Sequence, residues 1–335
     1  MKTTLLILGL MLATTFTFAQ NVIRVQNGQS LQTIIDDPAF VAGSVLLLDP
    51  GSYGSVIVRK RVSIIGSGYF NGTNEAQLDD VTFASNNLTA SDGSLITGCS
   101  MRTITISRSN ITVQRCRFYP NSSTDDINIG AIDNARLVQC FIDGNVVISG
   151  DATNFLIKNC IINGAIYTRN SSVRYTGVIA HNTMTYAACD VISLGTTNVN
   201  VTVANNILIT PATCNNANAG QNYRTDMFAS FNNNIVRLGN YQSTNPSNVF
   251  LNVANMAGTL FTPAGTSLEG QYMLSASSPA RGAGEGGTDC GAFGGADPYV
   301  LTGSPVGPVI QDLQVPATAR QNETIQIRLR AKIQN

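Results

Sequence analysis

The feature that most constrains this chain is a short unit that recurs along its middle section. The unit consists of an apolar residue, two variable residues, Cys or Asn, one variable residue and a second apolar residue. Its central residue recurs at steps of 17 to 28 residues, about 22 on average. Repetition of this length is typical of solenoids, in which each repeat packs against its neighbours. The unit occurs as Ile96/Cys99/Met101, Val113/Cys116/Phe118, Leu137/Cys140/Ile142, Ile157/Cys160/Ile162, Ile179/Asn182/Met184, Val203/Asn206/Leu208 and Phe231/Asn234/Val236.

The period of the repeat predicts one coil of a parallel β-helix. Three short strands and three turns need about 22 residues, and equivalent residues of adjacent coils then stack at about 4.8 Å. Asn side chains hydrogen-bond along such a stack, and Cys fills the same position as a small buried hydrophobe. The predicted buried column therefore contains four cysteines followed by three asparagines: Cys99, Cys116, Cys140, Cys160, Asn182, Asn206 and Asn234.

A second strand is predicted after the central residue of each coil. Short apolar runs such as Ile104–Ile106 and Val146–Ile148 follow that residue at similar distances. Because side chains of a strand alternate between its two faces, the middle residue of each run is predicted to point outward. These outward residues are Thr105, Asn128, Val147 and Tyr167.

The composition agrees with an all-β fold and argues against some partners. Charged residues make up only 12% of the chain, and 20 Lys and Arg balance 20 Asp and Glu. Without a net positive charge, binding to nucleic acid or to an anionic membrane surface is not expected. Much of the polarity comes from Asn, Ser, Thr and Gly, which are weak helix formers and suit tight turns.

The first residues have the pattern of a secretory signal peptide. Lys2 supplies a positive charge, Leu5–Ala13 is apolar, and Thr17–Ala19 precedes a cleavage site at Gln20. The apolar run is shorter than the roughly 20 residues that a membrane span requires. We therefore expect residues 1–19 to be removed and no transmembrane segment to remain. The predicted location is extracellular, or on the cell surface of a Gram-negative bacterium.

Two further regions resemble a known family. Leu48–Tyr53 and Val62–Gly68 look like the opening coils of pectate-lyase-like right-handed parallel β-helix proteins, and Ser278–Gly294 looks like the closing coil of secreted bacterial members. The resemblance implies a right-handed β-helix over residues 20–297, which agrees with the right-handed rule for parallel crossovers. It implies no single activity, because the family contains polysaccharide lyases, hydrolases and non-catalytic proteins.

The composition changes after Pro298. Several prolines mark a linker, and Thr324–Ile333 alternates apolar with polar residues as a strand does, with Val309–Val315 as a candidate partner. Two strands are too few for an independent domain. We expect residues 298–335 to form a linker and a short β appendage.

The seven cysteines leave at least one thiol without a partner in the chain. The four column cysteines are predicted to be reduced, because parallel side-chain vectors suit disulfide geometry poorly. Cys189 and Cys214 lie seven and eight residues after Asn182 and Asn206, in equivalent loops of adjacent coils, and we predict a disulfide between them. Cys290 is then the lone thiol. No Cys/His group has the spacing of zinc ligands, so no metal site is expected.

Candidate catalytic residues are few. A polysaccharide lyase needs a Lys or Arg base, with calcium or another cation to neutralise the substrate carboxylate. Lys158 and Arg136 are predicted to face outward on adjacent coils and form the best basic pair, unless they are simply a solvated pair. No Glu lies near them in the sequence, so a calcium cage is hard to assemble. Calcium is expected only if the protein is a lyase, and no other cofactor is predicted.

A hydrolase has weaker support. A glycoside hydrolase needs two carboxylates that flank the scissile bond, whereas Asp125 and Asp126 lie in a Ser/Thr-rich loop where such residues form turns. The only histidine, His181, is expected in a turn before Asn182, without the partners of a triad.

The outward face of the second strand is the predicted carbohydrate-binding surface, because the resembled enzymes place their groove there. Thr105 and Asn128 offer hydrogen bonds, and Tyr167 offers one aromatic ring for sugar stacking. The chain has no Trp, so a strong stacking platform is not expected.

Two functions stay open at this point. The first is a non-catalytic secreted or cell-surface protein that binds extracellular carbohydrate or acts as a structural or adhesive element. The alternative is a polysaccharide lyase or glycoside hydrolase, which a groove beside Arg136, Lys158 and Tyr167 would favour. In both cases the expected partner is an extracellular polysaccharide or a cell-surface component, and the protein is expected to be a monomer.

Overall fold

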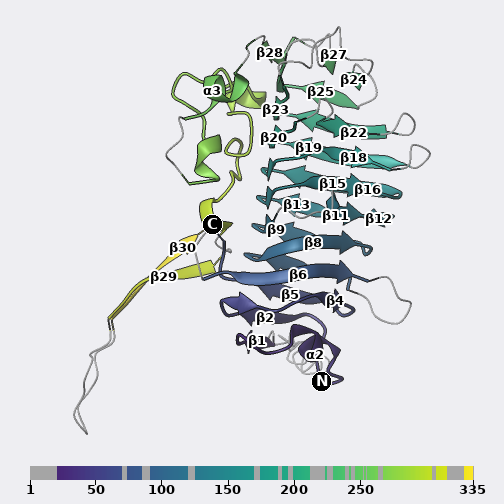
Figure 1. Ribbon diagram of the computed structural model, residues 1–335, viewed down its shortest axis with the longest axis vertical. Helices are drawn as coiled ribbons and strands as arrows, with labels where there is room; N and C mark the ends of the chain where they lie inside the picture. The colour runs from purple at the N-terminus through teal and green to yellow at the C-terminus, as the bar shows by residue number, and fades with distance from the viewer. Residues whose placement is uncertain are drawn as a thin grey trace, which may run out of the picture.

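The chain forms a right-handed parallel β-helix, and a C-terminal segment runs back along its side (Figure 1). The predicted signal peptide lies outside the described residues. None of the helices in the described part of the chain is long and apolar enough to cross a membrane. The computed structural model describes residues 21–69, 74–84, 91–119, 125–169, 174–187, 191–194, 199–211, 223–224, 229–237, 241–242, 246–251, 253, 255–262, 267–303, 307–314 and 328–334.

The first strand of each coil belongs to one parallel sheet, called sheet A. Neighbouring strands pair in register along the whole stack, so that Ile96, Val113 and Leu137 occupy equivalent inward positions. A short strand, β12 (Ile132–Asp133), also pairs with this sheet. Its main strands are β1 (Val22–Val25), β2 (Ser44–Leu48), β5 (Val62–Ile65), β7 (Leu95–Thr97), β9 (Thr112–Gln114), β13 (Arg136–Val138), β16 (Ala152–Lys158), β19 (Tyr175–Ala180), β22 (Val199–Ala204) and β25 (Ser230–Asn232).

The remaining coil strands form sheet B, which divides after the long strand β8 (Ser100–Ile106). Before β8 the sheet contains β3 (Gly51–Ser52), β4 (Val56–Val58) and β6 (Ala76–Phe83). Branch 1 contains β10 (Arg117–Phe118), β14 (Phe141–Ile142), β17 (Ile161–Ile162), β20 (Thr183–Thr185), β23 (Ile207–Ile209), β26 (Ile235–Arg237) and β28 (Val249–Leu251). Branch 2 contains β11 (Asp125–Ile129), β15 (Asn145–Ile148), β18 (Ile166–Thr168) and β21 (Ile192–Ser193). A separate parallel pair joins β24 (Tyr223–Arg224) and β27 (Tyr241–Gln242).

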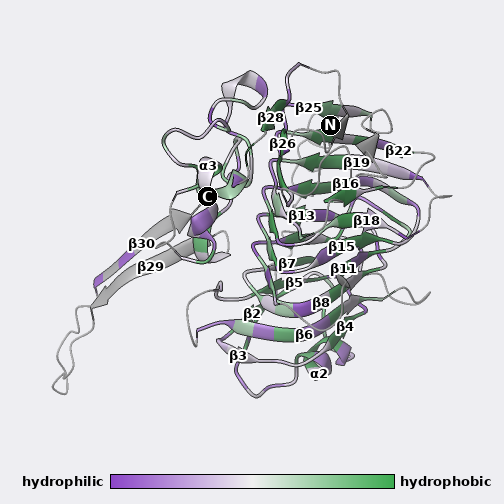
Figure 2. Cartoon of the chain, turned by 45° about the horizontal axis from the view of Figure 1, so that its top comes forward, coloured by the Kyte–Doolittle hydropathy of each residue, from purple (hydrophilic) through white to green (hydrophobic). Residues whose placement is uncertain are grey.

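The core runs as one apolar column through the stack. Each strand contributes alternate residues to it, and hydrophobic residues recur from coil to coil in the same positions (Figure 2). The N-terminal end is closed by helix α2 (Leu31–Asp36), whose Leu31 and Ile35 are buried. Gln32 of this helix accepts from the backbone N–H of Ile57 at 2.7 Å and donates to its carbonyl at 3.2 Å. The helix therefore covers strand groups that would otherwise present an open edge.

The predicted ladder is confirmed, since all seven of its residues are fully buried. Asn206 accepts from the backbone N–H of Asn182 through Oδ1 at 2.9 Å, and its Nδ2 donates to Asn234 Oδ1 at 3.0 Å and to Ile179 O at 2.9 Å. Each amide therefore joins three coils. Asn248 extends the ladder by one step, accepting from the N–H of Asn234 at 2.9 Å. The step is only 14 residues, which hides it from the sequence period.

The cysteine half of the ladder is also confirmed as free, buried thiols. Burial raises the pKa of Cys99 to about 12. Cys160 Sγ lies 3.4 Å from the backbone N of Cys140, in the place that an Asn oxygen takes in later coils. Cys290 is free and buried as well. Cys189 and Cys214 lie outside the described residues, and their disulfide stays a prediction.

In six successive coils, one left-handed residue precedes the ladder residue, where sheet A turns into branch 1. These residues have φ angles between 50° and 59°. Asn tolerates this backbone conformation, which explains why it is common here. The same turn aims the left-handed residue away from the core. The column consists of Arg115, Gln139, Asn159, His181, Asn205 and Asn233.

Residues 267–303, here called the strap, pack along this column and on the outer face of branch 1. The strap contains the 3-10 turns η2 (Gly270–Tyr272), η3 (Glu285–Gly287) and η4 (Leu301–Gly303), and helix α3 (Met256–Leu260) precedes it. Backbone carbonyl and N–H groups of the strap form hydrogen bonds with polar side chains of the column. The hydrogen bonds are Gln139 Nε2 to Pro298 O (2.7 Å), Asn159 Nδ2 to Ala292 O (2.9 Å) and Gly294 O (2.8 Å), Glu285 N to Asn205 Oδ1 (2.9 Å) and Asn233 Nδ2 to Ala283 O (3.2 Å).

The strap corrects one expectation from the sequence. Ser278–Gly294 was expected to form a closing coil, but the solenoid strands end at β28 and this segment runs back beside the coils of Asn233, Asn205 and Asn159. Gly295 shows how closely it approaches, because a Cβ there would lie 3.0 Å from the His181 ring. Strap residues such as Ala292 and Tyr299 cover outward apolar residues of branch 1.

A buried tyrosine–glutamate chain anchors the strap to an early coil. Tyr69 Oη lies 2.6 Å from Tyr299 Oη, which donates to Glu269 Oε2 at 2.7 Å. The other carboxyl oxygen of Glu269 accepts from the N–H of Thr302 at 2.5 Å. Glu269 is fully buried, and this burial raises the pKa of its carboxyl group above the ordinary value of 4.5.

The appendage is an antiparallel hairpin of β29 (Gly307–Gln314) and β30 (Arg328–Gln334). Both strands were predicted from the alternation of apolar and polar residues, and Thr324 lies outside the described residues. The hairpin extends away from the solenoid (Figure 1).

The ladder predicts a position-specific loss of stability. Asn206→Ala removes the acceptor of the Asn182 backbone N–H, one bond of Asn182 Nδ2 and the donor to the Ile179 carbonyl inside the core, which should cost about 3 kcal/mol. Asn200→Ala, an exposed position on the same strand β22, is the control. Chemical denaturation measures both variants, and equal stability losses would contradict the role of the ladder.

The buried Glu269 predicts a pH-dependent stability. Because its pKa is raised in the folded protein, its contribution is full below about pH 4.5 and falls as the pH rises through the raised pKa. The wild type should therefore lose more thermal stability between pH 4 and pH 7 than Glu269→Gln does. Glu285→Gln, an exposed change in the strap, should follow the wild type. Parallel pH profiles for all three proteins would exclude this role for Glu269.

Candidate groove between sheet A and the strap

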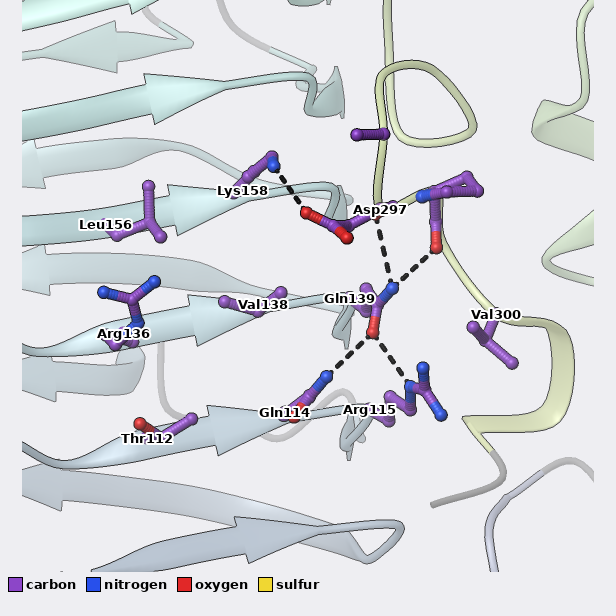
Figure 3. Close-up of a pocket in the computed structure, with 12 residues that line it drawn as sticks. Thr112, Gln114, Arg115, Arg136, Val138, Gln139, Leu156, Lys158, Asp297 and Val300 are labelled. Atoms are coloured by element: carbon purple, nitrogen blue, oxygen red, sulfur yellow. Dashed lines mark hydrogen bonds and ion pairs between the residues drawn. The ribbon is translucent and has the colours of Figure 1, made fainter. Parts of the chain in front are cut away.

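A groove of about 470 Å³ lies on the outer face of sheet A, beside the strap (Figure 3). Its floor is formed by β9, β13 and β16, and one wall by residues 296–300 of the strap. Both predicted basic residues line it. The lining residues are Thr112, Gln114, Arg115, Arg136, Val138, Gln139, Leu156, Lys158, Ala296, Asp297, Pro298 and Val300.

The strand register explains why the two cations lie together. Arg136 pairs with Leu156, and Val138 pairs with Lys158, so the cations lie on adjacent strands and two residues apart along them. Strand spacing and rise place their Cα atoms about 8 Å apart. Both residues point outward, because Leu137 and Ile157 between them point into the core. The prediction of an outward pair on adjacent coils is confirmed.

The two cations differ in their surroundings. Arg136 is exposed, and Figure 3 shows it at the start of β13, the strand that also carries Val138. The Lys158 side chain is 24% exposed, and its Nζ lies 3.0 Å from Asp297 Oδ2. Lys158 is thus not a simple solvated residue. Its partner comes from a segment 139 positions later in the chain.

Gln139 holds the strap wall in place. Its Nε2 donates to the carbonyl oxygens of Asp297 at 3.3 Å and Pro298 at 2.7 Å. Its Oε1 accepts from Gln114 Nε2 at 3.0 Å and from Arg115 Nε at 2.8 Å. These bonds use the whole amide, so Gln139 has a supporting role at the end of the groove (Figure 3).

Burial lowers the pKa of two turn residues beside the groove. It is the main cause that lowers the pKa of the Arg115 guanidinium. Burial also lowers the pKa of His181, and the charge of Lys158 lowers it further. His181 is therefore neutral at neutral pH. It lies in the predicted turn, with Nε2 3.1 Å from Asn205 Nδ2, which fits a structural role.

The predicted carbohydrate-binding residues lie elsewhere, on branch 2. Thr105, Asn128, Val147 and Tyr167 are in register as predicted, and Thr105, Asn128 and Tyr167 are half-buried. Val147 was expected to be exposed, and this is wrong because it is fully buried between its neighbours Asn128 and Tyr167. Asn128 accepts from Ser149 Oγ at 2.7 Å. The three candidates do not line the groove that holds Arg136 and Lys158.

The sequence pattern did not predict several groove residues, among them Gln114, Gln139 and Asp297. Gln114 lies two residues before Cys116 and Gln139 one residue before Cys140, so their positions within the repeat were a usable signal. Asp297 had no such signal, because it lies outside the repeat. Within the described residues, no group of three or more His, Cys, Asp or Glu side chains is arranged to hold a metal ion.

Comparison with known proteins gives limited information. No family model and no curated protein matches the sequence. Among solved structures, the chain is similar to the crystal structure of pectate lyase Pel9A, at 13% identity and a TM-score of 0.31. That similarity covers 82% of this chain and 96% of the lyase. Such a likeness carries no argument about activity, and the fold described above rests on the strand pairing.

Proposed function

We propose that this protein binds an acidic extracellular polysaccharide in the groove, without cleaving it. The observation that carries the proposal is the convergence of Arg136 and Lys158 on one walled groove. Secretion through the N-terminal signal peptide and action as a monomer are part of the proposal. The carbohydrate candidates on branch 2, Thr105, Asn128 and Tyr167, stay a second predicted contact surface.

The chemistry of the groove suits a uronate-containing chain. Guanidinium and ammonium groups form charge-assisted hydrogen bonds with carboxylates, and the two cations are spaced to meet two different carboxylates of one ligand. Thr112 and Gln114 add neutral polar groups that match sugar hydroxyls. Val138 and Leu156 lie between the polar residues and offer aliphatic contact to the C–H faces of sugar rings.

The surroundings of Lys158 support binding over catalysis. A lysine that abstracts a proton needs an unshared amino group, whereas Lys158 Nζ is held at 3.0 Å by the carboxylate of Asp297. Arg136 is exposed, and its guanidinium can donate two parallel hydrogen bonds to a carboxylate. Both groups are thus suited to bind a ligand carboxylate.

A polysaccharide lyase is the second candidate. The same groove favours it, because a base and a carboxylate-binding group would both be present beside a bound uronate. A lyase would also need calcium or another cation, for which the described residues offer no acidic cluster. An enzyme was expected to have a groove beside Arg136, Lys158 and Tyr167. The groove is lined by Arg136 and Lys158 but not by Tyr167.

The test measures binding and cleavage together. Calorimetry with polygalacturonate oligosaccharides should show binding that Arg136→Ala and Lys158→Ala each weaken about ten-fold, the value of one charge-assisted hydrogen bond. Neutral oligosaccharides should bind much more weakly. Arg24→Ala, an exposed arginine on the same sheet, is the matched control and should change nothing.

The same samples distinguish the two candidates. If the wild type releases an unsaturated product from the oligosaccharide and Lys158→Ala does not, the protein is a lyase and the proposal of binding without cleavage is wrong. Binding of acidic oligosaccharides that is equal in the wild type, Arg136→Ala and Lys158→Ala would contradict the groove as the site.

A further inference from the structure

The strap presents a carboxylate to the groove from a fixed backbone. Gln139 holds the carbonyls of Asp297 and Pro298, and Tyr299, the next residue, is buried in the tyrosine–glutamate chain. The side chain of Asp297 is nevertheless 69% exposed. The Asp297 carboxyl group that pairs with Lys158 can therefore change its rotamer while the Asp297 backbone stays in place.

The position of this carboxylate matches the chemistry that the groove would bind. A uronate that reached Lys158 would present the same group at the same distance. We propose that Asp297 is an internal competitor, which pairs with Lys158 and must be displaced by a ligand carboxylate. This inference rests on the proposed binding of acidic polysaccharide.

The strength of the pair makes such displacement feasible. Ion pairs with one well-exposed partner contribute little, up to about five-fold in an equilibrium constant. A ligand with a single carboxylate only exchanges one ion pair for another at Lys158. A ligand that also contacts Arg136 gains a second interaction, and no ion pair of Arg136 is present among the described residues. Asp297 therefore lowers the affinity of every ligand that reaches Lys158, and a second carboxylate at Arg136 compensates for that cost.

The experiment compares Asp297→Asn with the wild type. The variant keeps the size of the side chain and removes the charge, so polygalacturonate oligosaccharides should bind about two- to five-fold more tightly. Monomeric galacturonate bound at Lys158 should gain about the same factor, because it displaces the same carboxylate. Glu285→Gln is the control, since it removes a negative charge from the same strap outside the groove lining.

A double variant ties the effect to Lys158. In Lys158→Ala, the further change Asp297→Asn should have no effect on affinity, because the competitor has lost its partner. Unchanged or weaker binding by Asp297→Asn would overturn the inference and make Asp297 a support for Lys158 or a bystander. If Arg136→Ala still weakens binding in that case, the proposed binding function is retained and only the inference about Asp297 is wrong. If no acidic oligosaccharide binds any of these proteins, both proposals are wrong.

Discussion

The turn that carries the ladder is the contact on which the rest of the structure depends. In each coil a left-handed residue is followed by a fully buried Cys or Asn, so one turn both closes the coil and places an amide or thiol in the stack. An amide such as that of Asn206 bonds to the coils on either side of it. Because neighbouring coils share these bonds, stability is distributed along the stack, as expected for a solenoid.

The same turn produces the docking surface for the strap. A left-handed residue points away from the core, so six coils present a straight line of polar side chains. The strap satisfies several of them, and Glu269 and Tyr299 fix its far end to Tyr69. The groove arises where this irregular segment passes a regular sheet face. The floor of the groove consists of repeating strands, and its wall is the non-repeating strap. Lys158 of the floor therefore lies beside Asp297 of the wall.

Much of the fold could be predicted, and the reasons are local. Burial of one face per strand imposes a period of two, and the coil imposes a period of about 22, so Cys99 to Asn234 can be aligned by eye. The outward direction of Arg136 and Lys158 follows from the same alternation. Val147 shows the limit, because an outward residue is exposed only if its neighbours in the adjacent coils leave it uncovered. Asn248 shows another limit, since a short coil breaks the period.

The sequence by itself determined the parallel β-helix, the register of its coils, the ladder and the outward basic pair, because each follows from periodic burial within one segment. Only the tertiary structure decided the path of residues 267–303, the salt bridge of Lys158 with Asp297 and therefore the existence of a walled groove. The strap has no period to align, and its position depends on side chains more than 100 residues away in the chain. Contacts of that kind depend on matching surfaces that exist only after the solenoid has formed.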